Sequence, residues 1–222
     1  FLLEKRRNMK KIALFIICAS MVAIGMGQTM PGRITRTTVF ETFRPAIITL
    51  NDGKLLKQNE ANIFLKNSSL VYKHGRLNME ADMDQVESVN FGDCEYVRVD
   101  SVLARVVDTL NNDKLLCVSL IDVDAYRTQL LNNRQITNLE LREFVNVNGS
   151  DASPEVQSNY PLRNTFYYDI DGKIIKVHER NLKKYINDKN RRLYKTLLQS
   201  PDFSWEDPTS LIKLLKLITA TT

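Results

Sequence analysis

Two cysteines and two histidines carry the most versatile side-chain chemistry in the body of this 222-residue sequence. Cys94 and Cys117 could form a disulfide in an oxidising compartment, or they could be buried as small apolar thiols. His74 lies in a turn sequence, and His178 lies between a predicted strand and a predicted helix, where it could cap the helix or pack on Tyr185. The sequence places neither histidine beside a cysteine, and their isolation is atypical of zinc ligands. We therefore predict no catalytic thiol, no metal and no cofactor.

A short acidic sequence, Asp169-x-Asp171-Gly172, superficially resembles part of a calcium-binding loop. Such a loop needs an acidic residue at its first position and a glutamate at its twelfth. Aligning Gly172 with the loop glycine puts Tyr167 first and His178 twelfth, so the pattern fails and a β-turn is predicted. The sequence also lacks phosphate-loop, dinucleotide-binding, nucleophile-elbow and zinc-protease motifs. A hydrolase whose carboxylate site no motif marks stays open as an alternative.

Basic residues cluster near the C-terminus, where they could bind an anionic partner. The cluster consists of Lys183, Lys184, Lys189, Arg191, Arg192 and Lys195. Residues 164–222 hold eleven basic and seven acidic residues, whereas residues 28–163 hold fifteen basic and eighteen acidic ones. The cluster is either a solvated helix face or a surface for an anionic membrane, a lipid headgroup or an acidic envelope protein. Aromatic residues do not alternate with the basic ones on these helix faces, so nucleic acid is not a predicted partner.

Residues 1–27 have the composition of a secretory signal peptide. A basic stretch, KRRNMKK, precedes an apolar run, IALFIICASMVAIGMG, which ends in small residues. We expect cleavage before Gln28, which removes Cys18 with the leader. The apolar run is shorter than the roughly 20 residues that span a bilayer, so an uncleaved membrane anchor is the alternative. Met9 is the expected start, which makes residues 1–8 an upstream extension.

The positive charge of the whole chain comes mainly from this leader. The full sequence has 31 basic and 26 acidic residues, a net charge of +5 and a pI near 9.1. Five of the bases and one of the acids lie in residues 1–27, which leaves a net charge of +1 on residues 28–222. The basic pI is therefore a poor argument for nucleic-acid binding. We predict an exported protein, periplasmic or secreted, with no transmembrane span once the leader is removed.

The elements expected to position these residues are mainly strands. Short runs of alternating apolar and polar residues over 28–147 are separated by turn sequences, of which Asn51-Asp52-Gly53 is the strongest. The clearest predicted strands are 46–50, 61–66, 70–73, 85–91, 95–99, 102–110 and 114–123. The sequence lacks the helical crossovers that parallel strands need. We therefore predict an antiparallel β-meander with one wet face as the first domain, residues 28–147.

A loop and a small mixed unit complete the predicted architecture. Residues 148–163 have a loop composition and are the predicted linker to a C-terminal unit, residues 164–222. That unit is predicted to open with a hairpin over 165–178 that turns at Asp171-Gly172, and to continue as two or three helices, the first over 179–186. The predicted fold class is α+β, an antiparallel β-meander followed by a β-hairpin and a small C-terminal helical unit.

The last predicted helix has clear signals at its start and on its buried face. Asp207 is the predicted N-cap, and Pro208 follows at the first helical position, where its missing N–H costs nothing. The apolar stripe of this helix consists of Leu211, Leu214, Leu215 and Ile218. Phe203 and Trp205, in the connector before it, are expected to hold the short helices together.

The segment VESVNFGDCEYVRVD and the C-terminal tail from KIIKVH onward resemble exported proteins of unknown function from anaerobic Gram-negative bacteria. In those proteins a hairpin leads into a basic helix and then a closing helix with the pattern F-x-x-E-D-x-x-x-L-I-x-L-L. The matching residues of this sequence are Phe203, Glu206, Asp207, Leu211, Ile212, Leu214 and Leu215. The resemblance covers roughly residues 85–220. It implies an exported α+β protein and assigns no catalytic residue.

Three functions fit these observations. The leading hypothesis is a non-enzymatic envelope protein that binds a macromolecular partner or scaffolds an assembly, through exposed strand edges or the basic helices. The second is a carrier of a small ligand or lipid, which a cavity of about 300 Å³ or more between sheet and helices would favour. The third is the hydrolase with an unmarked carboxylate site. The sequence favours a binding protein over an enzyme without naming what it binds.

Overall fold

The fold comes from a computed structural model, which describes residues 32–132 and 160–219. The predicted leader, residues 1–27, lies outside the described residues. So do the expected upstream extension, residues 1–8, and residues 148–159 of the predicted linker.

Strands dominate the described part of the chain, because alternating apolar and polar residues are repeatedly punctuated by short turns. They are β1 (Arg33–Ile34), β2 (Arg44–Leu50), β3 (Leu55–Phe64), β4 (Ser69–His74), β5 (Leu77–Glu80), β6 (Val86–Asn90), β7 (Glu95–Val99), β8 (Val102–Leu110), β9 (Asp113–Ile121), β10 (Tyr160–Ile170) and β11 (Lys173–Lys176). The helices are short: α2 (Val123–Asn132), α4 (Glu179–Leu182), α5 (Arg191–Leu198) and α6 (Pro208–Thr219), with 3₁₀ turns η1 (Lys183–Tyr185) and η2 (Asp188–Asn190). No helix in these two ranges combines the length and the apolar character needed to cross a membrane.

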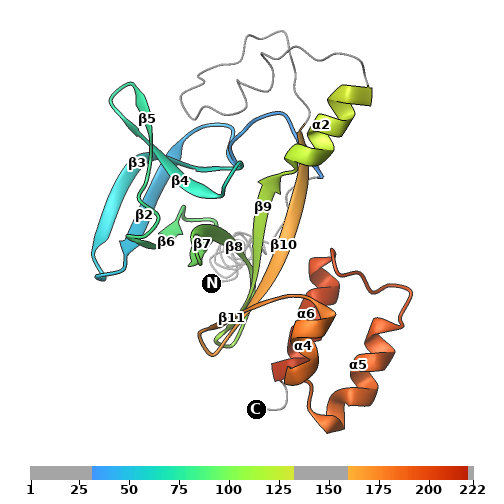
Figure 1. Ribbon diagram of the computed structural model, residues 1–222. Helices are drawn as coiled ribbons and strands as arrows, with labels where there is room; N and C mark the ends of the chain where they lie inside the picture. The colour runs from blue at the N-terminus through green and yellow to red at the C-terminus, as the bar shows by residue number, and fades with distance from the viewer. Residues whose placement is uncertain (1–31, 133–159, 220–222) are drawn as a thin grey trace, which may run out of the picture.

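The strands of the described ranges form one eleven-stranded antiparallel sheet with a meander-like order, as predicted (Figure 1). The order is β1-β10-β9-β8-β7-β6-β2-β3-β4-β5, with β11 beside β10. Strands that follow one another in the sequence are neighbours in the sheet with two exceptions: β1 pairs with β10 rather than with β2, and β6 pairs with β2 rather than with β5. The fold is therefore richer in sheet than the predicted α+β class, although the predicted C-terminal helix is present.

The sheet curls back on itself at the β3–β4 turn. The backbone N–H of Leu103 in β8 donates to the carbonyl of Ser68, and the N–H of Ile121 in β9 donates to the carbonyl of Leu65, both at 2.8 Å. The Ser68 hydroxyl returns a 2.6 Å bond to the carbonyl of Leu103. These bonds enclose a first core, whose fully buried members include Ile63, Leu65, Leu70 and Leu103.

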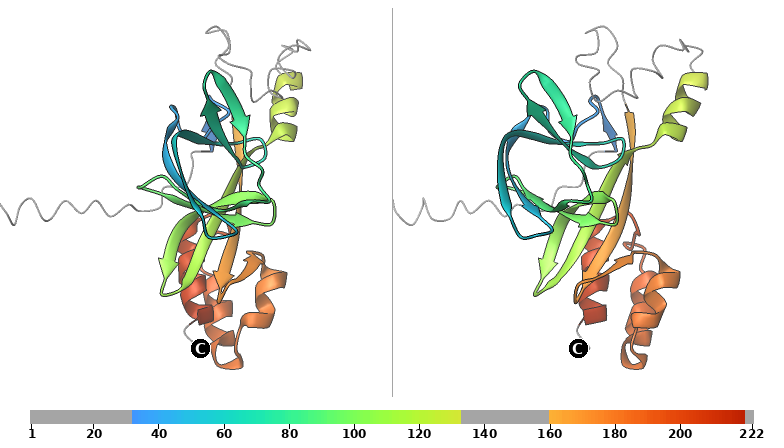
Figure 2. Two further views of the ribbon diagram at one scale, coloured as in Figure 1. Left: turned by 90° about the vertical axis from the view of Figure 1, so that its left-hand side faces the viewer. Right: turned by 60° about the vertical axis from the view of Figure 1, so that its left-hand side comes forward.

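The lower part of β8, β9 and β10 extends beyond this curl and carries the C-terminal helices (Figure 2). Because side chains alternate across a strand, Leu115 and Cys117 of β9 face the helices, while Leu116 and Val118 face the opposite side. The second core joins these strands to the helices and includes Leu115, Phe166, Tyr168, Ile175, Leu182, Tyr194, Leu211, Leu214, Leu215 and Ile218. The predicted apolar stripe of α6 is thus its buried face.

Strand β10 begins earlier than the sequence indicates. Residues 160–163, predicted as the end of the linker, are its first residues, and β10 pairs with β9 from Leu162 opposite Ile121 to Asp169 opposite Lys114. The loop-rich composition before residue 160 hid this start, because pairing with a distant strand leaves no local signal. One strand therefore contributes to both cores, with Leu162 packed against the first core and Phe166 buried in the second.

The first C-terminal helix is shorter than its apolar spacing predicts. The predicted helix 179–186 ends as α4 at Leu182, continues as the 3₁₀ turn η1, and gives way to extended backbone at Ile186 (φ −85°, ψ 114°). Asn187 explains this break, because its side-chain oxygen accepts the N–H of Lys189 at 3.1 Å and caps η2 instead. The chain therefore turns sharply between η1 and η2.

Candidate functional site

The six basic residues singled out by the sequence all lie in the C-terminal unit, and each of them is exposed. Lys183 and Lys184 belong to η1, Lys189 belongs to η2, and the other three belong to α5. Arg191 forms an ion pair with Asp188 at 2.9 Å, one turn earlier. Among the described residues, the other five cations have no carboxylate within ion-pair distance. We call this set of six side chains the basic surface.

A large apolar side chain is exposed on the helix that carries three of the six basic residues. Leu193 of α5 is 57% exposed, although the next residue, Tyr194, is buried in the second core. Arg192 precedes Leu193, and Lys195 follows Tyr194, so cations flank the exposed leucine in the sequence of the helix. An exposed leucine on a helix that also carries exposed cations offers both an apolar contact and positive charge to an acidic partner.

A pocket of about 540 Å³ opens beside the basic surface, between the β10–β11 hairpin and the end of α6. Its apolar lining comes from three isoleucines: Ile170 of β10, Ile186 just after η1, and Ile218 of α6. Its polar lining comes from Asp171, Lys173, Lys184, Tyr185, Asn187 and Thr219. The volume is in the range of small-molecule sites, about 300–1,000 Å³.

Two lysines converge on one aromatic ring in this pocket. The Nζ atom of Lys173 lies 5.6 Å from the ring centroid of Tyr185, and the Nζ atom of Lys184 lies 5.2 Å from it. Lys184 is the residue before Tyr185, whereas Lys173 comes from β11, on the opposite wall. Both distances are within the range of a cation–π contact, about 6 Å. Two ammonium groups of the pocket lining therefore lie near the same aromatic ring.

Two local backbone features build the walls of the pocket. On one side the extended residues Ile186 and Asn187 carry the chain along the pocket instead of continuing a helix. On the other side Asp171 (φ 51°) and Gly172 (φ 76°) form the β10–β11 turn in left-handed conformations, which glycine adopts without steric cost. The turn places Lys173 at the start of β11, directly across from Ile170 of β10.

Both cysteines are free thiols, so the disulfide alternative is not present in the structure. Cys117 of β9 is buried and pairs with Arg105 of the neighbouring strand β8. Burial raises the pKa of Cys117 to about 11. The hydrogen bond with Ser119 and the positive charge of Arg105 act in the opposite direction but are weaker. Burial and the negative charge of Asp93 likewise raise the pKa of Cys94 to about 11. Neither thiol is suited to nucleophilic chemistry near neutral pH.

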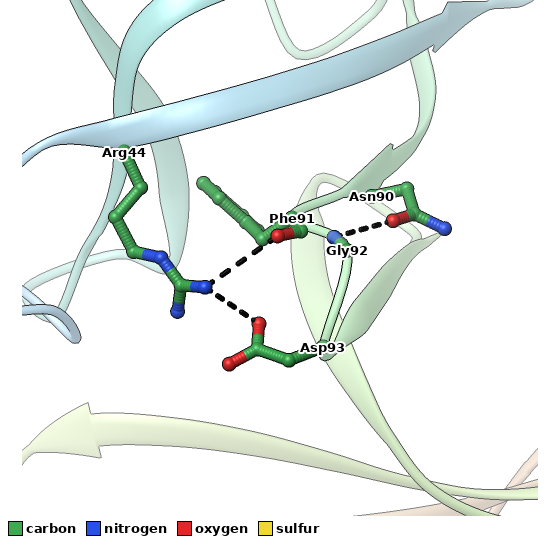
Figure 3. Close-up of polar contacts among 5 residues, drawn as sticks. All are labelled: Arg44, Asn90, Phe91, Gly92 and Asp93. Atoms are coloured by element: carbon green, nitrogen blue, oxygen red, sulfur yellow. Dashed lines mark hydrogen bonds and ion pairs between the residues drawn. The ribbon is translucent and has the colours of Figure 1, made fainter.

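An arginine clamps the β6–β7 turn to β2 (Figure 3). Arg44 of β2 donates through Nη2 to the carboxylate of Asp93 at 2.8 Å and to the carbonyl of Phe91 at 3.5 Å. Its guanidinium also lies 4.5 Å from the ring centroid of Phe40. The hydrogen bond from Arg44 lowers the pKa of Asp93. The charges of this cluster satisfy one another, so we assign it a structural role and not a binding role.

The two histidines have structural or solvated positions. His178 is the N-cap of α4, where its Nδ1 accepts the backbone N–H of Arg180 at 3.2 Å, which confirms the capping alternative. His74 is exposed at the end of β4. Within residues 32–132 and 160–219, no group of three or more histidines, cysteines, aspartates or glutamates could hold a metal ion.

The sequence identified Lys184 but missed the other residues that shape the pocket. Lys173 is one of many lysines near turns, and Tyr185 had the spacing of a core residue in a longer helix. Their proximity depends on how the hairpin packs against η1, which neither local segment encodes.

Comparison of the chain with protein-family models, with curated protein sequences and with solved structures finds no match.

Proposed function

We propose that this chain is a non-enzymatic envelope protein that docks through its basic surface on the acidic face of a partner protein. The observation that supports this proposal is the exposure of six cations and of Leu193 in one C-terminal unit, with one ion pair involving these cations within the described residues. Export to the envelope rests on the leader sequence, residues 1–27. The proposal explains why positive charge is concentrated in residues 164–222, although residues 28–222 together have a net charge of only +1.

The physical basis is a combination of charge and apolar contact. Exposed cations raise the rate of encounter with an acidic surface, and this effect is screened over about 8 Å at physiological salt. Fully burying a leucine is worth about 1.5–3 kcal/mol, so Leu193 can hold a complex that the charges have steered together. A lipid surface would usually need a broader apolar face than one leucine on an eight-residue helix.

The test is site-specific photo-crosslinking in cells that export the full chain. A photoreactive phenylalanine analogue at position 193 should yield one defined protein adduct, identified by mass spectrometry. The same analogue at Leu77 is the matched control, because Leu77 is 61% exposed and Leu193 is 57% exposed, but Leu77 lies on β5. The double variant Arg192→Glu, Lys195→Glu should reduce the adduct at least tenfold.

A second control separates local charge from overall charge. The variant Lys57→Glu, Arg76→Glu changes the net charge equally, at two exposed residues of the β-region. It should leave the adduct at position 193 unchanged. Equal adducts at positions 193 and 77, or adducts with lipid alone, would contradict the proposal.

A further inference from the structure

The pocket beside the basic surface has a division of polarity that matches a particular class of ligand. Ile170, Ile186 and Ile218 supply its apolar lining, and Ile218 belongs to the buried stripe of α6. Lys173 and Lys184 supply exposed ammonium groups at its rim. An apolar lining with a few convergent polar groups is the usual composition of a small-molecule site.

No carboxylate of the described residues neutralises the two ammonium groups of the pocket lining. Both lie within 6 Å of the Tyr185 ring centroid, whose π face offers each of them a modest attraction. Neither has a carboxylate within ion-pair distance among the described residues. Asp171 is the one acidic residue of the lining, and it also lies beyond that distance from both lysines. An anion in the pocket would supply the negative charge that both lysines lack and would accept hydrogen bonds from their ammonium groups.

We infer that this pocket binds a small anionic amphiphile. The ligand has one carboxylate or phosphate group, held by Lys173 and Lys184, and a compact apolar body that lies on the isoleucines and the Tyr185 ring. A free acid and the headgroup end of a single-chain lipid share this chemistry. This site goes beyond the proposed docking function and shares only Lys184 with the basic surface.

The test measures how tightly the protein binds four amphiphiles that have hydrocarbon tails of similar length and differ in headgroup. Octanoate and octyl phosphate carry the anionic groups, octyltrimethylammonium carries a cation, and octyl glucoside is neutral. Isothermal titration calorimetry of the full chain with each compound, below its micelle concentration, should give Kd values at least tenfold lower for the two anions. Vesicles containing phosphatidylglycerol, added as competitor, distinguish the sources: competition indicates a lipid headgroup, and its absence indicates a free amphiphile.

Matched variants test the two lysines. Lys173→Met and Lys184→Met keep the aliphatic part of the side chain and remove the charge, and each should weaken octyl phosphate binding about tenfold. Lys176→Met on the same strand and Lys183→Met beside Lys184 are the controls, because both residues are exposed and neither lines the pocket. These two variants should bind octyl phosphate as the unmodified chain does.

Two outcomes would overturn the inference: equal affinity for all four headgroups, or equal weakening by the control variants. Its failure is distinguishable from failure of the docking proposal. Arg192→Glu, Lys195→Glu should leave octyl phosphate binding within twofold, and Lys173→Met should leave the crosslink at position 193 intact. Loss of both octyl phosphate binding and the crosslink in either variant would show that the pocket and the basic surface are a single site.

Discussion

The hydroxyl of Tyr168 donates a 2.6 Å hydrogen bond to the backbone carbonyl of Leu211, and both residues are fully buried. Tyr168 lies in β10, and Leu211 lies in the first turns of α6, 43 positions later in the chain. This hydrogen bond fixes the position of α6 along the direction of β10. Because Ile170 and Ile218 are both part of the pocket lining, it also fixes two walls of the pocket relative to each other.

Replacing Tyr168 with phenylalanine should destabilise the junction between sheet and helices. The change removes one buried hydrogen bond and no carbon, so the free energy of unfolding should fall by about 1 kcal/mol. Denaturant unfolding followed by circular dichroism measures this loss. Tyr167→Phe is the control, because this neighbour faces the other side of the sheet. An equal loss in both variants would show that the bond to Leu211 has no particular role.

Removing the cap of α6 should loosen the same helix from its start. Asp207 accepts the N–H of Thr209 at 3.2 Å, and the N–H and hydroxyl of Ser210 at 2.9 and 2.8 Å. Asp207→Ala should lower the free energy of unfolding by about 1 kcal/mol. Asp202→Ala is the matched control, because only its backbone carbonyl takes part in this network. Similar melting temperatures for the two variants would contradict the capping role.

The cap also predicts an acid dependence. Burial alone would raise the pKa of Asp207, but the hydrogen bonds from Ser210 and Thr209 outweigh it and lower the pKa below its ordinary value. The unfolded chain therefore binds this proton at a higher pH than the folded chain does. The contribution of the cap is present above the unfolded pKa and is lost as the pH falls through the folded one. Unfolding measured from pH 5 to pH 2 should show a shallower decline in Asp207→Ala.

Both thiols should react slowly while the chain is folded. With a pKa of about 11, Cys94 and Cys117 have a thiolate fraction at pH 8 that is about a hundredfold below that of an ordinary cysteine. Iodoacetamide labelling, read by mass spectrometry, should be slow in buffer and fast in guanidinium. Rapid labelling of either cysteine in the folded chain would contradict this expectation.

The raised pKa of Cys117 also predicts that the folded chain is destabilised at alkaline pH. Between pH 9 and pH 11 the unfolded chain loses the Cys117 proton while the folded chain keeps it, so stability falls as the pH rises. Two pKa units correspond to about 2.7 kcal/mol. Burial also raises the pKa of Tyr96 and Tyr168, and both add to the decline above pH 10. Cys117→Ala should flatten the alkaline part of the curve, and an unchanged slope would refute the assignment.

The β6–β7 turn that Arg44 clamps depends on one glycine. Gly92 has φ +94°, and its N–H donates to the side chain of Asn90 at 2.6 Å (Figure 3). Gly92→Ala should cost about 1–2 kcal/mol, because a Cβ disfavours this backbone conformation. Gly32→Ala is the control, since a Cβ would meet open space at both positions and only Gly92 has a positive φ. Equal stability of the two variants would show that the turn tolerates the change.

Local signals were enough to predict the parts of the fold that local forces build. The predicted strands 95–99 and 102–110 coincide with β7 and β8, because runs rich in β-branched residues on either side of a two-residue turn indicate both strands. The N-cap and buried stripe of α6 were equally readable. The return of β6 to β2 and the start of β10 at Tyr160 were not, since both depend on pairing between distant segments.

The candidate site divides in the same way. Charge alone predicted that the six basic residues would be exposed, because an unpaired cation is costly to bury. The approach of Lys173 to Tyr185 followed from no pattern in either segment. It required the break after η1, the β10–β11 turn and the position of α6, which are set by three separate parts of the chain.

The double membership of β10 has a consequence for the order in which the chain folds. Arg33 of β1 pairs with Pro161, and Cys117 of β9 pairs with Phe166, so two early strands wait for a segment synthesised much later. Contacts between such distant residues slow folding, and unpaired strand edges promote aggregation in the meantime. A nascent chain that stalls before Tyr160 therefore exposes unpaired backbone on β1 and β9, and both strands become paired only when β10 has been synthesised.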